Sequence, residues 1–208
     1  MNMPVSGETT VRENAETLLA RADALSHLNI FISQDKAVVR AAADALDAAG
    51  AGAGGPLYGV PFCVKDNTDT STMPTTGGTP AFKDWRPAAN APVVQSLVDA
   101  GGLMIGKTNL HEMAFGSTSI NPYYGAVSNP WRLDHHPGGS SGGSAVAVAA
   151  GMAYVGSGTD TGCSIRQPAQ CCGIVGHKPT FGLVSKAGVL PLVESMDHVG
   201  PLTRTVRD

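Results

Sequence analysis

Apolar residues recur at helical spacing near the start of the chain. Residues 8–26 form a segment in which one face of a 3.6-residue period is apolar, which predicts an amphipathic helix. The residues on this face are Val11, Leu18, Leu19, Ala22 and Leu25. A second, Ala-rich helix is predicted over 35–49, with Asp35 as its N-cap, and the AGAGGP sequence at 51–56 ends it.

Short apolar runs and helical segments then alternate along the chain. Residues 57–64 are predicted to form a buried strand that delivers Lys65 and Asp66 at its C-terminal end. Later elements are a helix over 91–100, a strand over 103–105, a buried helix of small residues over 144–152, and a strand at 154–155 that leads into a Gly-rich loop at 156–162. The Gly- and Pro-rich segments 67–90 and 114–139 predict loops. This alternation predicts an α/β fold in which at least part of the sheet is parallel.

The composition is that of a globular protein without a nucleic-acid or membrane partner. Hydrophobic residues make up 42% of the 208 residues, charged residues make up only 15%, and the formal net charge is −3. No basic cluster suited to nucleic acid or to a membrane surface is present. The first residues lack a secretory-signal pattern, and the longest nearly apolar run, 145–156, is too short to span a bilayer. We therefore expect a cytoplasmic protein.

Several motifs that suggest cofactors fail on closer inspection. Residues 101–108 match the phosphate-loop pattern G-x-x-x-x-G-K-[ST], but the middle of the match is itself an apolar strand, so the glycine-rich turn is missing. His111-Glu112 begins a zinc-binding H-E-x-x-H motif, but Phe115 stands in place of the second histidine. The four cysteines follow no zinc spacing and are predicted to be reduced thiols. We expect no metal and no cofactor.

Three segments combine residues that could perform nucleophilic chemistry. In the first, Lys65 follows a buried strand, where loss of hydration lowers a lysine pKa; a lysine snorkelling at a strand end is the alternative. In the second, glycines flank Ser140 and Ser141, although a flexible linker has similar composition. In the third, a Gly-containing turn precedes Ser164 and could aim successive backbone amides at one point, or could be an ordinary capped turn.

Taken in this order, these segments resemble the amidase signature family. Ser140 and Ser164 stand 24 positions apart (164 − 140), as they do in that family, and the segments 105–109, 128–131 and 173–180 also resemble it. The resemblance extends from about Leu18 to the last residue. It implies a mixed, twisted sheet flanked by helices on both faces. It also implies one domain over 1–208, with a helical lead-in at 1–56 and a catalytic core at 57–208.

The resemblance implies a role for each candidate residue. Ser164 is expected to be the nucleophile and Lys65 the ultimate base, with Ser140 relaying the proton and its peptide bond to Gly139 in the cis form. The residues whose backbone amides would form the oxyanion hole are Thr161, Gly162, Cys163 and Ser164. The residues expected to support this arrangement are Ser141, Asp160 and Arg166.

The chain also departs from the family pattern. Cys163 precedes the nucleophile where the family usually has Gly or Ala, so its side chain could crowd the oxyanion hole. Cys171 stands where Phe is frequent. Family members continue well beyond the segment that ends at Asp208, so the chain resembles their N-terminal portion, apparently truncated on its C-terminal side. Such a portion is expected to expose apolar surface.

Three functions remain open from the sequence. The first is hydrolysis of a small-molecule amide through an acyl-enzyme, because segments 109–116 and 121–125 resemble stand-alone amidases of the indoleacetamide and mandelamide kind. The second is the glutaminase-type amidase component of a tRNA-dependent amidotransferase, which would depend on partner subunits. The third is a catalytically silent fragment or interaction module. A homodimer is left open.

Overall fold

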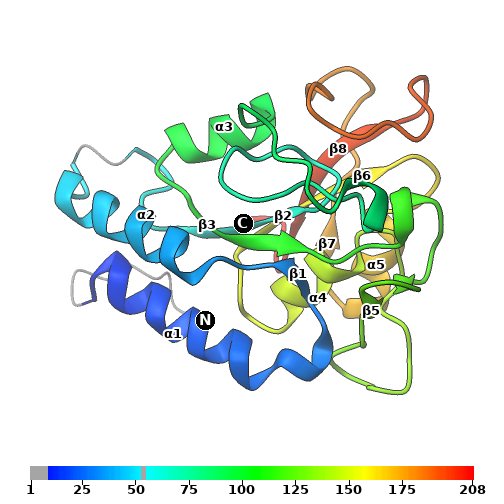
Figure 1. Ribbon diagram of the computed structural model, residues 1–208, viewed down its shortest axis with the longest axis horizontal. Helices are drawn as coiled ribbons and strands as arrows, with labels where there is room; N and C mark the ends of the chain where they lie inside the picture. The colour runs from blue at the N-terminus through cyan, green and yellow to red at the C-terminus, as the bar shows by residue number, and fades with distance from the viewer. Residues whose placement is uncertain (1–8, 53–54) are drawn as a thin grey trace.

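The computed structural model describes residues 9–52 and 55–208 and shows a mixed sheet with helices on both sides (Figure 1). The helices are α1 Val11–Ala24, α2 Lys36–Ala49, α3 Pro92–Asp99, α4 Gly142–Ala149 and α5 Arg166–Cys172, with short 3₁₀ turns at Ser26–Leu28, Pro80–Phe82 and Glu112–Ala114. The strands are β1 Phe31–Ser33, β2 Pro61–Lys65, β3 Leu103–Thr108, β4 Ile120–Asn121, β5 Gly125–Ala126, β6 Val155–Asp160, β7 Val175–Gly176 and β8 His198–Thr203.

Six strands form the main sheet in the order β1-β3-β2-β6-β8-β7. Strand β2 lies at its centre and runs parallel to both β3 and β6, whereas β1, β8 and β7 pair antiparallel to their neighbours. Strands β4 and β5 form a separate two-stranded hairpin. The predicted α/β fold with a partly parallel sheet is therefore confirmed.

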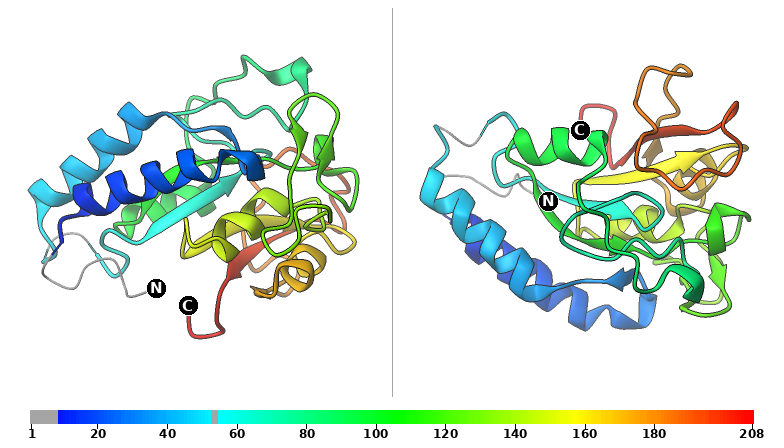
Figure 2. Two further views of the ribbon diagram at one scale, coloured as in Figure 1. Left: turned by 90° about the horizontal axis from the view of Figure 1, so that it is seen from below. Right: turned by 45° about the horizontal axis from the view of Figure 1, so that its top comes forward.

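Alternate residues of β2 divide the core between the two faces of the sheet. Phe62 and Val64 pack with Val94 of α3 on one face, whereas Cys63 belongs to the larger core on the other face. Helices α1, α2 and α4 contribute to that larger core, and Figure 2 shows α3 on the opposite side of the sheet from α1 and α2. Lys65 follows Cys63 by two positions, so the strand's alternation places it on the same face as Cys63.

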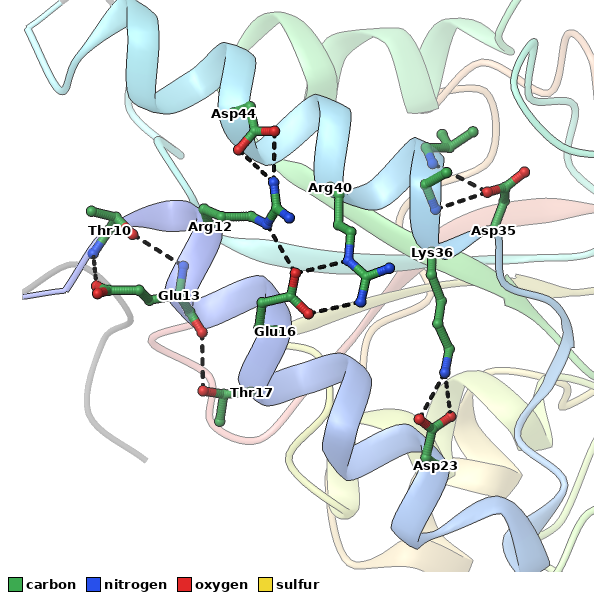
Figure 3. Close-up of polar contacts among 12 residues, drawn as sticks. Thr10, Arg12, Glu13, Glu16, Thr17, Asp23, Asp35, Lys36, Arg40 and Asp44 are labelled. Atoms are coloured by element: carbon green, nitrogen blue, oxygen red, sulfur yellow. Dashed lines mark hydrogen bonds and ion pairs between the residues drawn. The ribbon is translucent and has the colours of Figure 1, made fainter.

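The two predicted N-terminal helices form an antiparallel pair (Figures 2 and 3). Thr10 and Glu13 form a capping box at the start of α1, and Asp35 caps α2 through the amides of Ala37 and Val38. The prediction that this helix begins at residue 8 falls outside the described residues. Ion pairs link the exposed sides, among them Arg40 to Glu16 and Lys36 to Asp23 (Figure 3). Because such exposed pairs contribute little, the buried apolar face holds the helices to the core.

The strand predicted at 154–155 is much longer, and the predicted loop at 156–162 is wrong over most of its length. Strand β6 continues through the glycines to Asp160. A Cβ on Gly156 would lie 3.0 Å from the Ser144 carbonyl oxygen, and one on Gly158 would lie 2.7 Å from a Leu202 methyl. These glycines therefore allow α4 and β8 to pack closely against the strand, which is a packing role and not a turn role.

Three other predicted elements shift at their ends. Strand β2 begins at Pro61, because residues 57–60 form turns that include Gly59 with φ 68°. Strand β3 continues to Thr108 and so includes the lysine and threonine of the rejected phosphate-loop match, which confirms the rejection. Helix α4 begins at Gly142, two residues before the predicted start.

All four cysteines carry free thiols. Among the described residues, no helix has the length and apolar character needed to cross a membrane.

Candidate active site

Lys65 ends the central strand with its side chain completely buried. Its Nζ donates to Ser140 Oγ at 2.7 Å and to Thr159 Oγ1 at 2.7 Å. This burial contradicts the alternative of a lysine snorkelling to solvent. Burial lowers the pKa of Lys65 to about 7, against the opposing effect of Asp160 and Asp197. A substantial share of the side chain is therefore neutral at neutral pH, as a general base requires.

Ser140 lies in a loop that is fixed on several sides, directly before α4. The Gly139–Ser140 peptide bond is cis, as the family resemblance predicts. The Ser140 carbonyl oxygen accepts from the His111 amide at 3.2 Å and from Ser119 Oγ at 3.3 Å. A Cβ on Gly139 would lie 2.8 Å from the Ser119 amide nitrogen, so this close approach requires glycine. These contacts exclude the flexible-linker interpretation of the segment.

Ser141 connects the cis loop both to the end of β6 and to the turn that carries Ser164. Its amide donates to the Ser164 carbonyl oxygen at 3.2 Å. Its hydroxyl lies 3.3 Å from the carbonyl oxygen and 3.3 Å from the amide nitrogen of Thr159, within hydrogen-bond reach of each. The three segments singled out in the sequence therefore meet at one place in the fold, although they are far apart along the chain.

Ser164 lies on the turn between β6 and α5 and is 8% exposed. Within the described part of the chain, its hydroxyl forms no hydrogen bond, either with Ser140 or with another residue. Catalytic hydrogen bonds in enzymes without substrate are often long and tighten when substrate binds. A hydroxyl without a partner among the described residues is compatible with the predicted nucleophile, and the Ser164 backbone is held by the Ser141 amide.

Asp160 and Arg166 form a pair that encloses this turn. Asp160 Oδ2 accepts from the Ile165 amide at 3.0 Å and from Arg166 Nε at 3.1 Å, and Arg166 Nη2 also donates to the Gly162 carbonyl oxygen. Burial alone would raise the pKa of Asp160, but these hydrogen bonds lower it overall. The pair thus fixes both ends of the turn that carries the four predicted oxyanion-hole residues.

Two of those four residues have side-chain contacts that bear on the turn. Thr161 Oγ1 donates to Asp197 Oδ1 at 2.5 Å. The Cys163 sulfur lies 3.6 Å from the side-chain amide of Gln167, one helical turn later. When this amide is oriented to satisfy its donors, its nitrogen donates to the carbonyl oxygens of Ser117 and Gly139 at 3.0 and 3.1 Å. The side chain of Cys163 therefore contacts a residue that is itself bonded to the cis loop.

Thr159, Asn67 and Asp197 belong to the site although the sequence did not predict them. Thr159 Oγ1 accepts from both Lys65 Nζ and Asn67 Nδ2, the latter at 3.1 Å. A pocket of about 480 Å³ opens beside these side chains. The residues that line it include Asn67, Thr159, Thr161, Leu190, Asp197 and His198. The pocket thus reaches from Thr159, a partner of Lys65, to Thr161, the first of the four residues predicted to form the oxyanion hole.

A buried ion pair between Asp66, which directly follows β2, and Lys107 of β3 holds the loop that follows Lys65. Lys107 Nζ lies 2.9 Å from Asp66 Oδ1, and both side chains are inaccessible to solvent. Lys107 also donates to Thr75 Oγ1 at 2.9 Å, and Asp66 Oδ2 accepts from the Thr76 amide at 3.0 Å. Burial raises the pKa of Asp66 and lowers that of Lys107. The lysine of the phosphate-loop match is therefore a structural residue.

Replacing Lys107 with methionine is expected to lower the free energy of unfolding by about 3–5 kcal/mol, because Asp66 is left buried without its cation. Chemical denaturation monitored by circular dichroism measures the loss. The matched control is Lys36→Met, which breaks the exposed pair with Asp23 and should leave the midpoint nearly unchanged. The double variant Lys107→Met/Asp66→Asn should recover part of the loss. A Lys107→Met variant as stable as the wild type would contradict this account.

Known proteins are similar to this chain in sequence and in fold. The amidase family model matches residues 13–208. A glutamyl-tRNA(Gln) amidotransferase subunit from Nitratidesulfovibrio vulgaris is 49% identical over 193 residues, which are 93% of this chain and 38% of that protein. A solved amidase structure is 46% identical with a TM-score of 0.92, over 98% of this chain and 47% of the other.

The peptide amidase of Stenotrophomonas maltophilia is a third relative, with a TM-score of 0.92. It is 38% identical, over 98% of this chain and 44% of the other. The chain thus spans less than half the length of each of these relatives. The family match covers nearly the whole chain and includes Lys65, Ser140 and Ser164. On this evidence, the chain belongs to the amidase family.

Proposed function

We propose that this chain carries the acylation machinery of an amide hydrolase, with Ser164 as nucleophile, Ser140 as proton relay and Lys65 as base. The observation that carries the proposal is the completely buried Lys65 Nζ, 2.7 Å from Ser140 Oγ. A lysine pKa of about 7 suits a base that must accept a proton at neutral pH. The hydrogen bond from Ser141 to the Ser164 backbone supports it by holding the nucleophile's turn beside this pair.

The proposed reaction begins with proton transfer along the three residues. Neutral Lys65 accepts the Ser140 proton, Ser140 accepts the Ser164 proton, and Ser164 Oγ forms a bond to the amide carbonyl carbon. The amides of residues 161–164 stabilise the negative charge that develops on the carbonyl oxygen. When the C–N bond breaks, Ser140 gives a proton to the departing nitrogen and takes one back from Lys65. Water then attacks the acyl carbonyl carbon and gives a proton to Ser140, which passes its own proton to Lys65. As the ester C–O bond breaks, the proton returns through Ser140 to Ser164 Oγ and the carboxylic acid is released.

For the substrate, the comparisons favour a glutaminase-type role over the aryl-acetamide class expected from the sequence. The first relative is part of a glutamyl-tRNA(Gln) amidotransferase and is 49% identical over 93% of this chain. We therefore propose that the physiological role is release of ammonia from an amide donor such as glutamine, in a complex with partner subunits. Stand-alone amide hydrolysis is the second candidate, favoured by the structural similarity to the peptide amidase.

Ammonia release from two substrate classes tests this choice. Glutamine represents the amidotransferase role. Two other substrates, indoleacetamide and a peptide with a C-terminal amide, represent the stand-alone role. Each is assayed with the chain alone and with the chain co-expressed with the other amidotransferase subunits of its organism. Glutamine hydrolysis that requires those subunits is the expected result. Hydrolysis of the other amides by the chain alone would instead support the second candidate.

A further inference from the structure

Asp197 links two segments that border the active site. It directly precedes β8, is 8% exposed, and accepts from Thr161 Oγ1 through Oδ1 at 2.5 Å. The same carboxylate accepts from the amides of Leu192 at 2.9 Å and Val193 at 3.0 Å. Leu192 lines the 480 Å³ pocket, so one buried carboxylate joins the pocket wall to the turn that follows β6.

The sheet register explains why these two residues meet. In the antiparallel pairing of β6 and β8, Asp160 lies opposite His198. Thr161 directly follows β6 and Asp197 directly precedes β8, at the point where the backbone pairing ends. A side-chain hydrogen bond thus continues the contact between the strands by one position, at the first residue of the turn that carries Ser164. Figure 1 shows the segment before β8 looping beside the end of β6.

We propose that Asp197 is a positioning residue that holds Thr161 so that the amides of residues 161–164 converge on the reacting carbonyl oxygen. The inference rests on the proposed function, since it concerns the oxyanion turn of that reaction. Asp160 and Arg166 fix the far side of the same turn. Without Asp197, the contacts that remain on the near side among the described residues are the pairing of β6 with β8 and the contact of Ser141 with Thr159.

The charge of Asp197 also acts on the catalytic lysine. Burial alone would raise the pKa of Asp197, but hydrogen bonds from Thr161 and the two amides lower it overall, so the group is a carboxylate at neutral pH. Asp160 and Asp197 are the carboxylates that oppose the effect of burial on Lys65. Other charged or titratable groups among the described residues are Asp66 with its partner Lys107, Lys186, Glu194 and His198 around the pocket, and Lys178, whose Nζ lies 3.3 Å from His198 Nε2.

Two variants separate the positioning effect from the charge effect. Thr161→Val removes the donor without changing charge, and should slow Ser164 acylation about 10- to 100-fold at an unchanged pH dependence. Asp197→Asn should slow it similarly and also move the acid limb of the pH profile to lower pH, because a lost negative charge favours neutral Lys65. Thr161→Ser keeps the donor and should restore the rate. Asp134→Asn, in an exposed pair with Arg132, is the matched control.

The measurement is the rate of fluorophosphonate labelling of the full chain from pH 5.5 to 9, followed by mass spectrometry, with circular dichroism to confirm folding. Slow labelling of Thr161→Val with rescue by Thr161→Ser would support the inference. Wild-type labelling rates in both Thr161→Val and Asp197→Asn would overturn it while leaving the proposed function intact. If Asp197→Asn does not fold, the two Thr161 variants still decide the question. A wild-type chain that does not label would instead reject the proposed function.

Discussion

A Ser164→Ala variant is expected to hydrolyse amides at least about 10³-fold more slowly than the wild type, with its fold unchanged. The variant removes the atom that attacks the carbonyl and leaves only the binding and oxyanion contributions. Because the Ser164 hydroxyl forms no hydrogen bond among the described residues, its loss should cost little stability. The effect is measured as kcat/KM for ammonia release from the amide that the wild-type chain hydrolyses.

The matched control for this loss is Ser71→Ala, which removes an exposed serine hydroxyl near Asn90, away from the site. It should keep the wild-type rate. A Ser164→Ala variant within about tenfold of the wild type would show that another group attacks the amide. Cys163 would then be the first residue to test, since its thiol is the neighbouring nucleophile.

A Lys65→Met variant is expected to hydrolyse amides about 10²- to 10⁴-fold more slowly than the wild type, which is the range for removal of a positioned base. Methionine keeps much of the buried volume and removes the amine that contacts Ser140 and Thr159. The wild-type rate should rise with pH through about 7, the pKa of Lys65, because the protonated lysine cannot accept a proton. The variant should lose this acid limb, which a pH–rate profile would show.

Stability gives an independent check on the same group. Burial holds the pKa of Lys65 at about 7 in the folded protein, whereas an unfolded lysine titrates near ~10.4. Between these values the unfolded chain binds more protons, so this group makes stability rise with pH from about 7 to ~10.4. Below about pH 7 Lys65 is protonated in both the folded and the unfolded state, so the free energy of unfolding carries the full cost of burying its charge. A Lys65→Met variant with the same pH dependence of stability and rate as the wild type would contradict the assignment of the base.

The sequence pattern predicted the parts of the fold that carry apolar periodicity. The helix with its Asp35 cap and the strand that ends at Lys65 lie where the pattern placed them, apart from shifted ends. From Gly156 onward the pattern predicts a loop in place of β6, because Gly156, Gly158 and their polar neighbours show no apolar alternation. The glycines are required by the closeness of α4 and β8, which is a property of the packed sheet and not of the local sequence.

The sequence motifs predicted those residues of the candidate site that lie within the motifs. The resemblance placed Lys65, Ser140 and Ser164 together with a cis bond at Ser140, and the structure shows that bond and the contact of Lys65 with Ser140. The sequence gives no sign of Thr159 as a site residue, because its Gly-rich segment shows no strand pattern that would aim the side chain at Lys65. Asp197 was missed because β8 contains Gly200 and Pro201, which conceal a strand, and because its partner Thr161 lies 36 positions earlier.

The measurement that tests the central claim most directly is the site of fluorophosphonate attachment on the full 208-residue chain. Peptide mass spectrometry would locate the adduct, with the Ser164→Ala variant in parallel. A single adduct on Ser164 that forms faster as pH rises through about 7, and that is absent from the variant, is the predicted result. A folded chain that forms no adduct, or forms one on Cys163 or Ser140, would contradict the claim that Lys65 and Ser140 activate Ser164 here.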